Sequence, residues 1–347
     1  MANLLGGGAE RVTVNIIKQL DKEKFDISLV MVSLEGVFLN EIPSHVKIIN
    51  LNAKKTLYSI FKFRSIIKKI KPDIIYSTLF HTSIAQYIAL FNVKDRPKII
   101  LRNPTSPKLL FQEGGLGFLW KFLLKKAYKS ADKILAQTPE MQDEISYYYD
   151  IKQKYVDIFI NPLDTNGIDH KVNNIANPFD DEKINVVAAG RLTQAKAFDT
   201  LLYAFKEVIE KNNKFILHII GRDDGEKETL LALQKNLGLE KNVNFLGFQD
   251  NPYRFFYFSD LFVLSSRREG LPNAVLENLY LKKPVIATRC IPFMSKIINS
   301  GKNGYIVDVD DITGLSMAII NYKTLDELGT CKSFNPSSPN KYFLELG

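Results

Sequence analysis

Residues 184–221 read INVVAAGRLTQAKAFDTLLYAFKEVIEKNNKFILHIIG and hold one strand–helix–strand unit. The runs INVVAAG (184–190) and FILHIIG (215–221) are apolar, and each ends in glycine, which is typical of buried strands. Between them, residues 197–211 repeat apolar side chains at helical spacing. A strand followed by a helix and a second strand indicates parallel pairing, so this stretch predicts an α/β fold.

The same alternation extends in both directions along the chain. Further strand-like runs are FDISLVMVS (25–33), PDIIYS (72–77), PKIILR (97–102), DKILAQ (132–137), VDIFIN (156–161), VNFLGF (243–248), LFVLSS (261–266) and PVIAT (284–288). Residues 161–183 interrupt the alternation with Asn, Asp, Pro and Gly, which predicts a linker. We therefore expect two doubly wound, Rossmann-like domains, residues 1–161 and 162–347, facing across a cleft.

Composition excludes several classes of protein. With 347 residues, 46% hydrophobic and 24% charged, the chain is neither disordered, collagen-like nor a coiled coil as a whole. Two cysteines, Cys290 and Cys331, and four scattered histidines give no disulfide framework and no zinc site. No run reaches the roughly 18 apolar residues of a membrane-spanning helix, and no signal peptide is evident. We expect a cytoplasmic protein.

The net charge of +8 is concentrated in the first half of the chain. Residues 1–165 hold 24 Lys and Arg against 16 Asp and Glu. Residues 54–71 (KKTLYSIFKFRSIIKKIK) contain seven basic residues and no acidic one, with apolar residues between them, which predicts a basic amphipathic helix. This helix is either a solvated helix packed on a sheet or a contact with an anionic membrane surface. No nucleic-acid-binding signature accompanies it, so we expect no nucleic acid partner.

Three loops carry the candidate chemistry, and the first opens the chain. Gly6–Arg11 (GGGAER) precede a helix, and glycines at Gly7 and Gly8 let backbone N–H groups approach an anionic ligand. The spacing does not match the G-x-G-x-x-G of dinucleotide-binding dehydrogenases, although Glu35 keeps that alternative open. A plain tight turn without a ligand is the other alternative.

The second and third loops follow predicted strands of the second domain. Gly190, Arg191 and Lys196 lie on a strand-to-helix turn, where two cations suit a diphosphate and can neutralise a leaving-group anion. The run REGLPNAVLE (268–277) places Glu269 on a loop and Glu277 two turns into the next helix. Two such carboxylates can bind sugar hydroxyls while N–H groups at the helix start face phosphates. The loop and helix start contribute Gly270, Leu271, Pro272, Asn273 and Ala274.

Several of these segments, taken in order, resemble the family 4 retaining glycosyltransferases of GT-B fold. They are GGGAERV (6–12), NPLD (161–164), AAGRLTQAK (188–196), IIG (219–221) with VNFLGF (243–248), and SSRREGLPNAVLENLYLKKPVIAT (265–288). The resemblance covers most of residues 5–322. It implies a nucleotide-sugar donor in residues 162–347, an acceptor in residues 1–161, and transfer of a sugar to a hydroxyl with the anomeric configuration kept.

The resemblance also implies roles for single residues. Arg191 and Lys196 would bind the donor diphosphate, Glu269 the sugar hydroxyls and Glu277 the ribose. The turn near Gly247 would contact the base, while Gly7 and Gly8 would lie close to the donor sugar. Many relatives present a histidine where Arg102 and Asn103 end a predicted strand. His81, after the preceding strand, is a candidate for that role or a structural histidine.

The sequence departs from the family pattern at three positions. Lys282 and Ala197 stand where glycine is common, and Lys296 stands where glutamate is frequent. The pair Asp308 and Asp310 imitates the metal-binding Asp-x-Asp of another glycosyltransferase fold. Its position before an expected helix favours a helix cap at Asp310 or Asp311, so we expect no metal site and no required cofactor.

These observations and the resemblance together predict a hexosyltransferase of bacterial polysaccharide or lipopolysaccharide assembly. We expect a UDP-hexose or UDP-N-acetylhexosamine donor, a glycan or lipid-linked acceptor, and a peripheral position on the cytoplasmic membrane. A nucleotide-sugar binding protein without turnover and a sugar-nucleotide epimerase remain alternatives. Only Met1–Leu5 precede the glycine loop, and residues 328–347 lack an evident helix that crosses back to the first domain. We therefore expect lower stability or activity than the motifs alone suggest.

Overall fold

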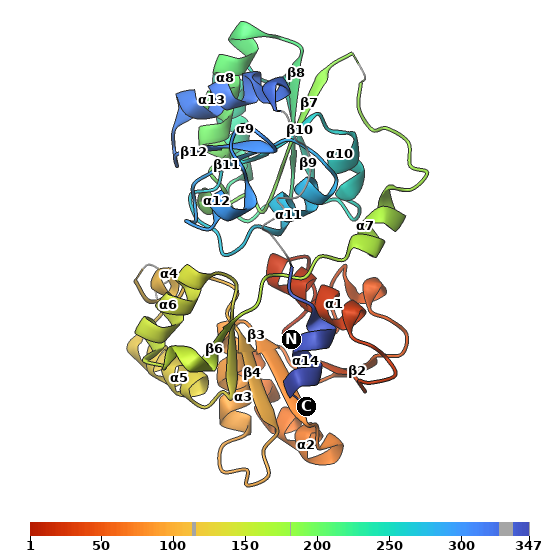
Figure 1. Cartoon of the computed structure of the whole chain (residues 1–347), viewed down its shortest axis with the longest axis vertical. Coiled ribbons are helices and arrows are strands. Elements are labelled where there is room, and N and C mark those ends of the chain that lie inside the picture. The colour runs from red at the N-terminus through yellow and green to blue at the C-terminus, as the bar shows by residue number, and fades with distance from the viewer. Residues whose placement is uncertain (113–115, 181, 326–335, 347) are drawn as a thin grey trace. The chain divides into compact units, whose positions relative to one another are not determined.

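The protein is described by a computed structural model that covers residues 1–112, 116–180, 182–325 and 336–346. The chain divides into two compact units (Figure 1). The first contains Met1–Asp164 and Pro336–Gly347, and the second contains Thr165–Asn335. Both units are α/β structures with parallel strands, as the sequence predicts. The expected boundary at residue 161 and the assignment of the whole C-terminus to the second domain differ from this division.

The second unit is built on six parallel strands in the order β12-β11-β10-β7-β8-β9. Its strands are β7 (Ile184–Ala189), β8 (Phe215–Ile220), β9 (Val243–Gly247), β10 (Leu261–Leu264), β11 (Val285–Thr288) and β12 (Gly304–Val307). Its helices are α7 (Thr165–Val172), α8 (Phe198–Lys211), α9 (Lys227–Asn236), α10 (Tyr253–Phe258), α11 (Asn273–Tyr280), α12 (Met294–Ile297) and α13 (Ile312–Ile320). Short 3-10 turns are η4 (Gln194–Lys196) and η5 (Tyr322–Thr324). Both strands of the quoted unit, β7 and β8, pair in parallel from Ile184↔Phe215 onward, as predicted.

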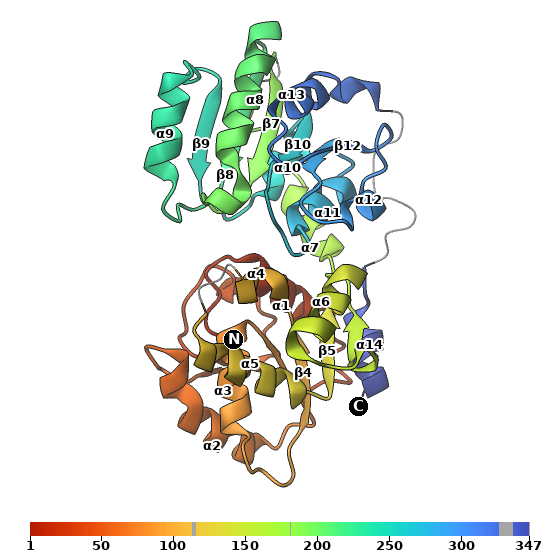
Figure 2. The same ribbon diagram turned by 90° about the vertical axis from the view of Figure 1, so that its left-hand side faces the viewer.

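Alternate side chains of this sheet pack on opposite layers of helices. Val263 of β10 joins one apolar cluster with residues of α8 and α13, which lie side by side in Figure 2. Phe262, the next residue toward the N-terminus, packs edge-on against Phe256 of α10 at a ring-centroid distance of 5.5 Å. Because both faces are covered, the strands are apolar without alternation, as parallel sheets require.

The first unit contains two separate sheets. The strands β1 (Ser28–Met31) and β2 (Lys47–Asn50) form one, and β3 (Ile74–Thr78), β4 (Lys98–Arg102), β5 (Lys133–Ala136) and β6 (Val156–Ile158) form the other in that order. The helices are α1 (Gly8–Gln19), α2 (Ile60–Ile70), α3 (Phe80–Ala89), α4 (Pro107–Gln112), α5 (Phe118–Lys129), α6 (Pro139–Tyr149) and α14 (Pro339–Leu346). The 3-10 turns are η1 (Leu39–Glu41), η2 (Thr56–Ser59) and η3 (Gln153–Tyr155).

The C-terminal segment returns to this first unit. Phe343 of α14 packs in one apolar cluster with Val12 and Ile16 of α1 and with Ile100 of β4. Figure 1 shows α14, in dark blue, beside α1. The expectation that a crossing helix is lost from this end is therefore wrong for residues 339–346, because the short KYFLEL run carries an apolar face. The part of that expectation that concerns residues 328–335 lies outside the described residues.

The expected linker at residues 161–183 contains structure that the sequence pattern did not reveal. Residues 165–172 form α7, and Lys171 O accepts a hydrogen bond from Asn251 Nδ2 at 2.9 Å. Upstream of α7, the carbonyl of Pro162 accepts from Asn15 Nδ2 of α1 at 3.0 Å, and Lys18 of α1 pairs with Asp164 at 2.9 Å. These bonds hold residues 162–164 on the first unit, which moves its boundary to Asp164.

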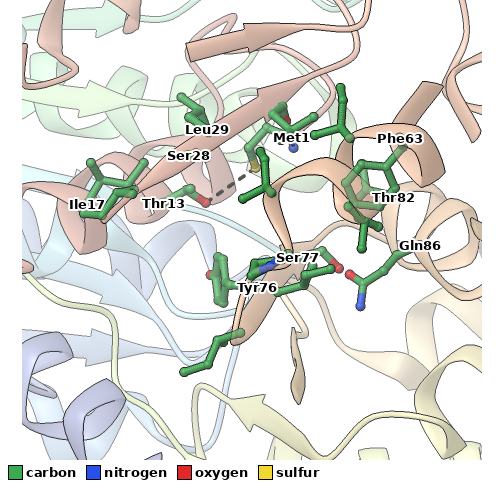
Figure 3. Close-up of a pocket in the computed structure, with 18 of the residues that line it drawn as sticks. Met1, Thr13, Ile17, Ser28, Leu29, Phe63, Tyr76, Ser77, Thr82 and Gln86 are labelled. Carbon is green, nitrogen blue, oxygen red and sulfur yellow. Dashed lines mark hydrogen bonds between the residues drawn. The ribbon is translucent and has the colours of Figure 1, made fainter. Parts of the chain in front are cut away.

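A groove separates the two sheets of the first unit. Its volume is about 700 Å³, and its walls are β1, β3, α1, α2, α3 and α14 (Figure 3). Met1 lines this groove, and its amino group donates to Val30 O at 2.8 Å while its carbonyl accepts from Val32 N at 3.1 Å. Residues 1–5 form no strand, so within the described residues β1 and β3 each lack a strand neighbour on the side that faces the groove.

Candidate functional site

Two of the predicted catalytic residues meet at the carboxyl ends of the neighbouring strands β7 and β10. Lys196, in the turn before α8, donates from Nζ to Glu269 Oε1 at 2.5 Å. Ser266, which follows β10, donates from Oγ to the same carboxylate oxygen at 2.8 Å. The Lys196 and Glu269 side chains are only 22% and 15% exposed, so water weakens their attraction little. This geometry places a cation and a carboxylate at the edge where open α/β sheets bind ligands.

Gly190 makes room for the lysine side chain. A Cβ atom at Gly190 would lie 2.8 Å from Lys196 Cε and 2.9 Å from Cδ. Because real Cβ atoms do not approach other atoms so closely, a larger residue would displace the aliphatic stem of Lys196. The role of Gly190 is therefore steric in this structure.

Arg191 points to a different partner. Its Nη1 pairs with Asp224 Oδ2 at 2.6 Å, and both side chains are about half exposed, at 55% and 40%. Asp224 follows β8 and belongs to none of the predicted site motifs. Thus Lys196 and Glu269 are brought together, whereas Arg191 lies on the same turn as Lys196 and pairs elsewhere.

The start of α11 supplies the predicted helix terminus. Pro272 is the N-cap residue in extended conformation, and its own side chain has no polar atom with which to cap the helix. Asn273 and Ala274 form its first turn, after Gly270 and the buried Leu271. A helix N-terminus favours negative charge, so this end of α11 is suited to a phosphate oxygen.

Glu277 lies one turn further along α11 and is nearly buried. Its Oε1 accepts a hydrogen bond from Tyr253 OH of α10 at 3.2 Å. Gly247, at the end of β9, has φ +68° and accepts from Gly221 N at 2.9 Å, which places it on the carboxyl edge of the same sheet. Tyr253 is a site neighbour that the sequence did not indicate, because an aromatic residue on a short helix resembles any core residue.

The glycine loop of the first unit is occupied by its own chain. Glu10 Oε2 accepts from Gly6 N at 2.8 Å and from Gly7 N at 2.9 Å, just before α1 begins at Gly8. The Gly7-x-x-Glu10 spacing matches that of a capping box and could have identified this contact. An anion that binds to these two N–H groups has to displace the Glu10 carboxylate.

His81, Arg102 and Asn103 have separate environments. His81 is partly buried near the start of α3, and burial, with a smaller effect of the N-terminal ammonium, lowers its pKa. Arg102 is 2% exposed and donates from Nη2 to Asn161 Oδ1 at 2.6 Å. Asn103 is 3% exposed and accepts from Tyr128 OH at 2.8 Å. The last two side chains therefore lie in the interior of the first unit.

The Asp-x-Asp pair has structural partners. Asp311 caps α13 by accepting from Gly314 N at 2.8 Å, as the sequence predicted for Asp310 or Asp311. Asp310 instead binds Arg267, and Asp308 lies 3.3 Å from Arg289. Across the described ranges, no group of three or more His, Cys, Asp or Glu side chains could hold a metal ion.

Cys290 follows β11 and interacts electrostatically with Glu269 and Lys196. Burial raises the pKa of its thiol to about 12, with a smaller contribution from the Glu269 carboxylate. The thiol is therefore protonated near neutral pH and is a poor nucleophile.

No helix in the described part of the chain has the length and apolarity needed to cross a bilayer.

Comparisons with known families agree with this architecture. The family described as Glycosyltransferase Family 4 matches residues 6–166, and the family described as Glycosyl transferases group 1 matches residues 170–335. The chain belongs to the family 4 glycosyltransferases.

Individual relatives differ in how much of their length is matched. An uncharacterized glycosyltransferase of Methanocaldococcus jannaschii is 33% identical over 249 residues, which cover 68% of this chain and 60% of the relative. A Campylobacter jejuni N-acetylgalactosamine-N,N'-diacetylbacillosaminyl-diphospho-undecaprenol 4-alpha-N-acetylgalactosaminyltransferase is 27% identical over 323 residues, covering 89% of this chain and 85% of that protein.

Solved structures share the GT-B fold with this chain. Anabaena HepE in complex with UDP and glucose superimposes with a TM-score of 0.77 at 17% identity, over 100% of this chain and 99% of that one. Sucrose-phosphate synthase of Thermosynechococcus elongatus gives 0.77 at 16% identity, over 100% and 94%.

Proposed function

We propose that this protein transfers a sugar from a nucleotide-diphosphate donor to a hydroxyl group of a lipid-linked glycan acceptor in bacterial polysaccharide assembly. The contact between Lys196 and Glu269, beside the start of α11, carries this proposal. The donor binds the unit that contains Thr165–Asn335, and the acceptor binds the unit that contains the glycine loop. Arg102 and Asn103 have no direct part in this proposal because both are buried.

The Lys196–Glu269 pair is suited to a donor that carries both phosphate and hydroxyl groups. When such a donor binds, the ammonium of Lys196 exchanges its carboxylate partner for a diphosphate oxygen, with the N-terminus of α11 nearby. Glu269, still held by Ser266, then accepts hydrogen bonds from sugar hydroxyls. Arg191 reaches the same diphosphate by leaving Asp224, since this ion pair is exposed and weak.

The transfer step needs no nucleophilic side chain. The bond between the anomeric carbon and the phosphate oxygen breaks, and its electron pair leaves with the diphosphate. The acceptor hydroxyl attacks the same face of the sugar and passes its proton to the departing phosphate, so the anomeric configuration is kept. Lys196 stabilises the negative charge that develops on this leaving group.

The names of relatives support the donor and acceptor classes. HepE was solved with UDP and glucose, and the Campylobacter enzyme is named for a diphospho-undecaprenol acceptor. We therefore propose a UDP-hexose or UDP-N-acetylhexosamine as donor and a polyprenyl-diphosphate glycan as acceptor. No resident cofactor or metal ion is part of this proposal.

The exposed face of α2 and η2 supports a peripheral position on the inner face of the cytoplasmic membrane. Phe61 and Tyr58 are 83% and 68% exposed, and Lys55, Lys68 and Lys69 are exposed on the same segment. Lysines that flank exposed aromatic rings favour an anionic bilayer surface, where lipid-linked acceptors are found.

Transfer assays on Lys196→Ala and Glu269→Gln test the proposal. A panel of UDP-, GDP- and ADP-sugars first identifies a donor by the rise in melting temperature. We expect each variant to lose about 100- to 1,000-fold in turnover, because a preorganised charge is removed. The matched control is Lys206→Ala with Glu210→Gln, an exposed pair at 3.5 Å on α8. Donor binding without nucleotide release on addition of acceptor would instead identify a binding protein.

A further inference from the structure

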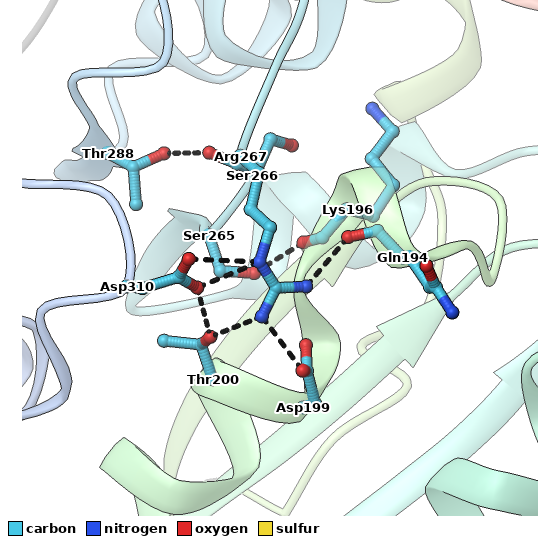
Figure 4. A network of polar contacts seen from close by, with 9 residues as sticks. All are labelled: Gln194, Lys196, Asp199, Thr200, Ser265, Ser266, Arg267, Thr288 and Asp310. Carbon is cyan, nitrogen blue, oxygen red and sulfur yellow. Dashed lines mark hydrogen bonds and ion pairs between the residues drawn. The ribbon is translucent and has the colours of Figure 1, made fainter. Parts of the chain in front are cut away.

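The Arg267 side chain donates five hydrogen bonds beside the candidate site, and no sequence motif marks this residue (Figure 4). Its Nε donates to Asp310 Oδ1 and Oδ2 at 2.9 and 3.0 Å. Its Nη2 donates to Asp199 Oδ2 at 2.8 Å and Thr200 Oγ1 at 3.1 Å, and its Nη1 donates to Gln194 O at 2.8 Å. One guanidinium thus joins the β7–α8 turn, the first turn of α8 and the loop before α13.

The β7–α8 turn that Arg267 binds carries Lys196, and we call residues 191–197 the lysine turn. Besides the guanidinium bond to Gln194 O, the backbone N–H of Arg267 donates to Ala195 O at 2.8 Å. Ser265 Oγ, two residues earlier, donates to Lys196 O at 2.9 Å. Three consecutive carbonyls of the lysine turn are therefore bound by residues 265–267. Glu269 lies only two residues further, so the same loop holds both members of the Lys196–Glu269 pair.

The lysine turn needs such support because its backbone is strained. Ala197 has φ +50° and ψ +43°, a left-handed conformation that is disfavoured for a residue with a Cβ atom. A residue in this conformation persists when neighbouring contacts determine it. The bonds from Arg267 and Ser265 supply such contacts on the N-terminal side of Ala197.

The charge on Arg267 is committed to this network. The hydrogen bonds that the guanidinium donates to Asp199 and Asp310 raise its pKa, and the bonds that Asp310 accepts from Arg267 lower the pKa of Asp310. Two carboxylates already neutralise this cation, so it has little charge to offer a ligand. The forked geometry of the guanidinium lets one side chain bind three segments at once.

We infer that Arg267 is a positioning residue that sets the location of the Lys196 ammonium relative to Glu269. This inference rests on the proposed function, because it assigns a purpose to the geometry of that site. Arg267 acts through the backbone of the lysine turn and has no contact with the reacting atoms. A misplacement of about 1 Å at a catalytic group can lower turnover roughly 100-fold.

The first test compares Arg267→Gln in two backgrounds. In the otherwise unaltered protein we expect turnover to fall about 10- to 100-fold. In a Lys196→Ala background the same change should lower turnover by less than about threefold, because the lysine that Arg267 positions is already absent. Arg289→Gln, which removes the exposed ion pair with Asp308, is the matched control and should leave turnover within about twofold. Equal losses from Arg267→Gln in both backgrounds would overturn the inference.

A second measurement needs no substrate and separates this inference from the proposed function. Amide hydrogen exchange in residues 191–197 should speed up in Arg267→Gln and remain unchanged in β8. If Arg267→Gln folds poorly, Asp310→Asn serves as the second variant, because it keeps the shape of the side chain. We expect it to give a smaller increase in exchange rate at the same positions. Unchanged exchange there in both variants contradicts positioning by Arg267. If exchange changes but no nucleotide sugar supports turnover by the unaltered protein, the proposed function fails and the structural inference stands.

Discussion

Lys282 has a backbone conformation that usually requires glycine. It follows α11 with φ +58°, and Lys283 N donates to Asn278 O at 2.9 Å across the helix end. Glycine is the usual residue at this position after a helix, because a side chain is disfavoured at positive φ. The sequence alone shows a lysine at a position where glycine is common in the family. The positive φ of Lys282 shows that this lysine strains the backbone.

We therefore expect Lys282→Gly to raise the free energy of unfolding by about 0.5–1 kcal/mol. The side chain is exposed, so its removal leaves no cavity. Denaturant unfolding measures the change. Lys235→Gly, at an exposed position within α9, should lower stability by about 1 kcal/mol. A loss of stability on Lys282→Gly would show that its conformation is not strained.

His218 is a buried neutral imidazole. Its Nε2 lies 3.0 Å from Asn185 Oδ1, and its ring packs on Phe179 at a centroid distance of 4.4 Å. Burial lowers its pKa to about 4 from the ordinary 6.5. The folded state therefore binds fewer protons than the unfolded state between these two pH values.

Because the unfolded chain binds more protons in that window, stability should fall as pH falls from 6.5 through 4. Protonation of this one group should lower the free energy of unfolding by about 3 kcal/mol in total, and this loss is complete below about pH 4. Unfolding at pH 7 and pH 4.5 compares the unaltered protein with His218→Gln, whose pH dependence should be shallower. His45→Gln, at an exposed histidine, is the control. Identical pH slopes for all three proteins would show that His218 does not contribute.

Among the elements, the predicted parallel strands are confirmed. They can be predicted because a buried strand is a short apolar run that differs from its surroundings in the sequence. Less obvious elements were not predicted, among them α7 in the assumed linker and β2 with its mostly exposed side chains. The basic helix begins at Ile60, not at residue 54, since residues 56–59 form a 3-10 turn. Periodicity locates elements that bury a regular face, whereas α7 is fixed by contacts with α10 that lie far away in the sequence.

The exposed face of α2 and η2 leads to a prediction about lipid binding. Charge reversal of Lys55, Lys68 and Lys69 to Glu should lower binding to anionic vesicles about tenfold or more, because each lysine contributes roughly 1 kcal/mol there. Lys62 is left intact, since its Nζ donates to Leu51 O at 2.8 Å. Vesicle flotation at low and high salt measures the effect.

The matched control for flotation reverses Lys227, Lys235 and Lys241, three exposed lysines of the second unit, and so makes the same change in net charge. Binding should persist in this control. Equal recovery of the unaltered protein on neutral and anionic vesicles would contradict an electrostatic attachment.

At the scale of the whole molecule, two of the three loops predicted to carry the site, at residues 190–196 and 268–277, are on the carboxyl edge of the second unit's sheet, whereas the glycine loop belongs to the first unit. The sequence indicated Lys196 and Glu269 because they flank recognisable strands and a Gly-Leu-Pro turn. It could not indicate that Arg191 pairs with Asp224, or that Arg267 binds Asp199 and Asp310, because these partners meet only in the folded sheet. Their identity depends on tertiary distances that no local pattern contains.

The divided sheet of the first unit predicts a stabilising extension. Met1 already bonds to Val30 and Val32 beside β1, so a strand placed before Met1 would run parallel to β1 through the groove. Five apolar residues added there should raise the free energy of unfolding by about 2 kcal/mol or more, and so the melting temperature by several degrees. A Gly-Ser extension of equal length is the control. Equal melting temperatures for the two extensions would show that the groove does not accept a strand.

The groove also makes the two units unequal under hydrostatic pressure. Pressure favours the state of smaller volume, and unfolding eliminates imperfectly packed internal space. A space of about 700 Å³ with many apolar walls lies within the first unit, between α1 and α2. Raising the hydrostatic pressure should therefore unfold the first unit at a pressure where the six-stranded sheet of the second unit still gives its folded amide NMR signals. The first unit should thus have the lower resistance to pressure.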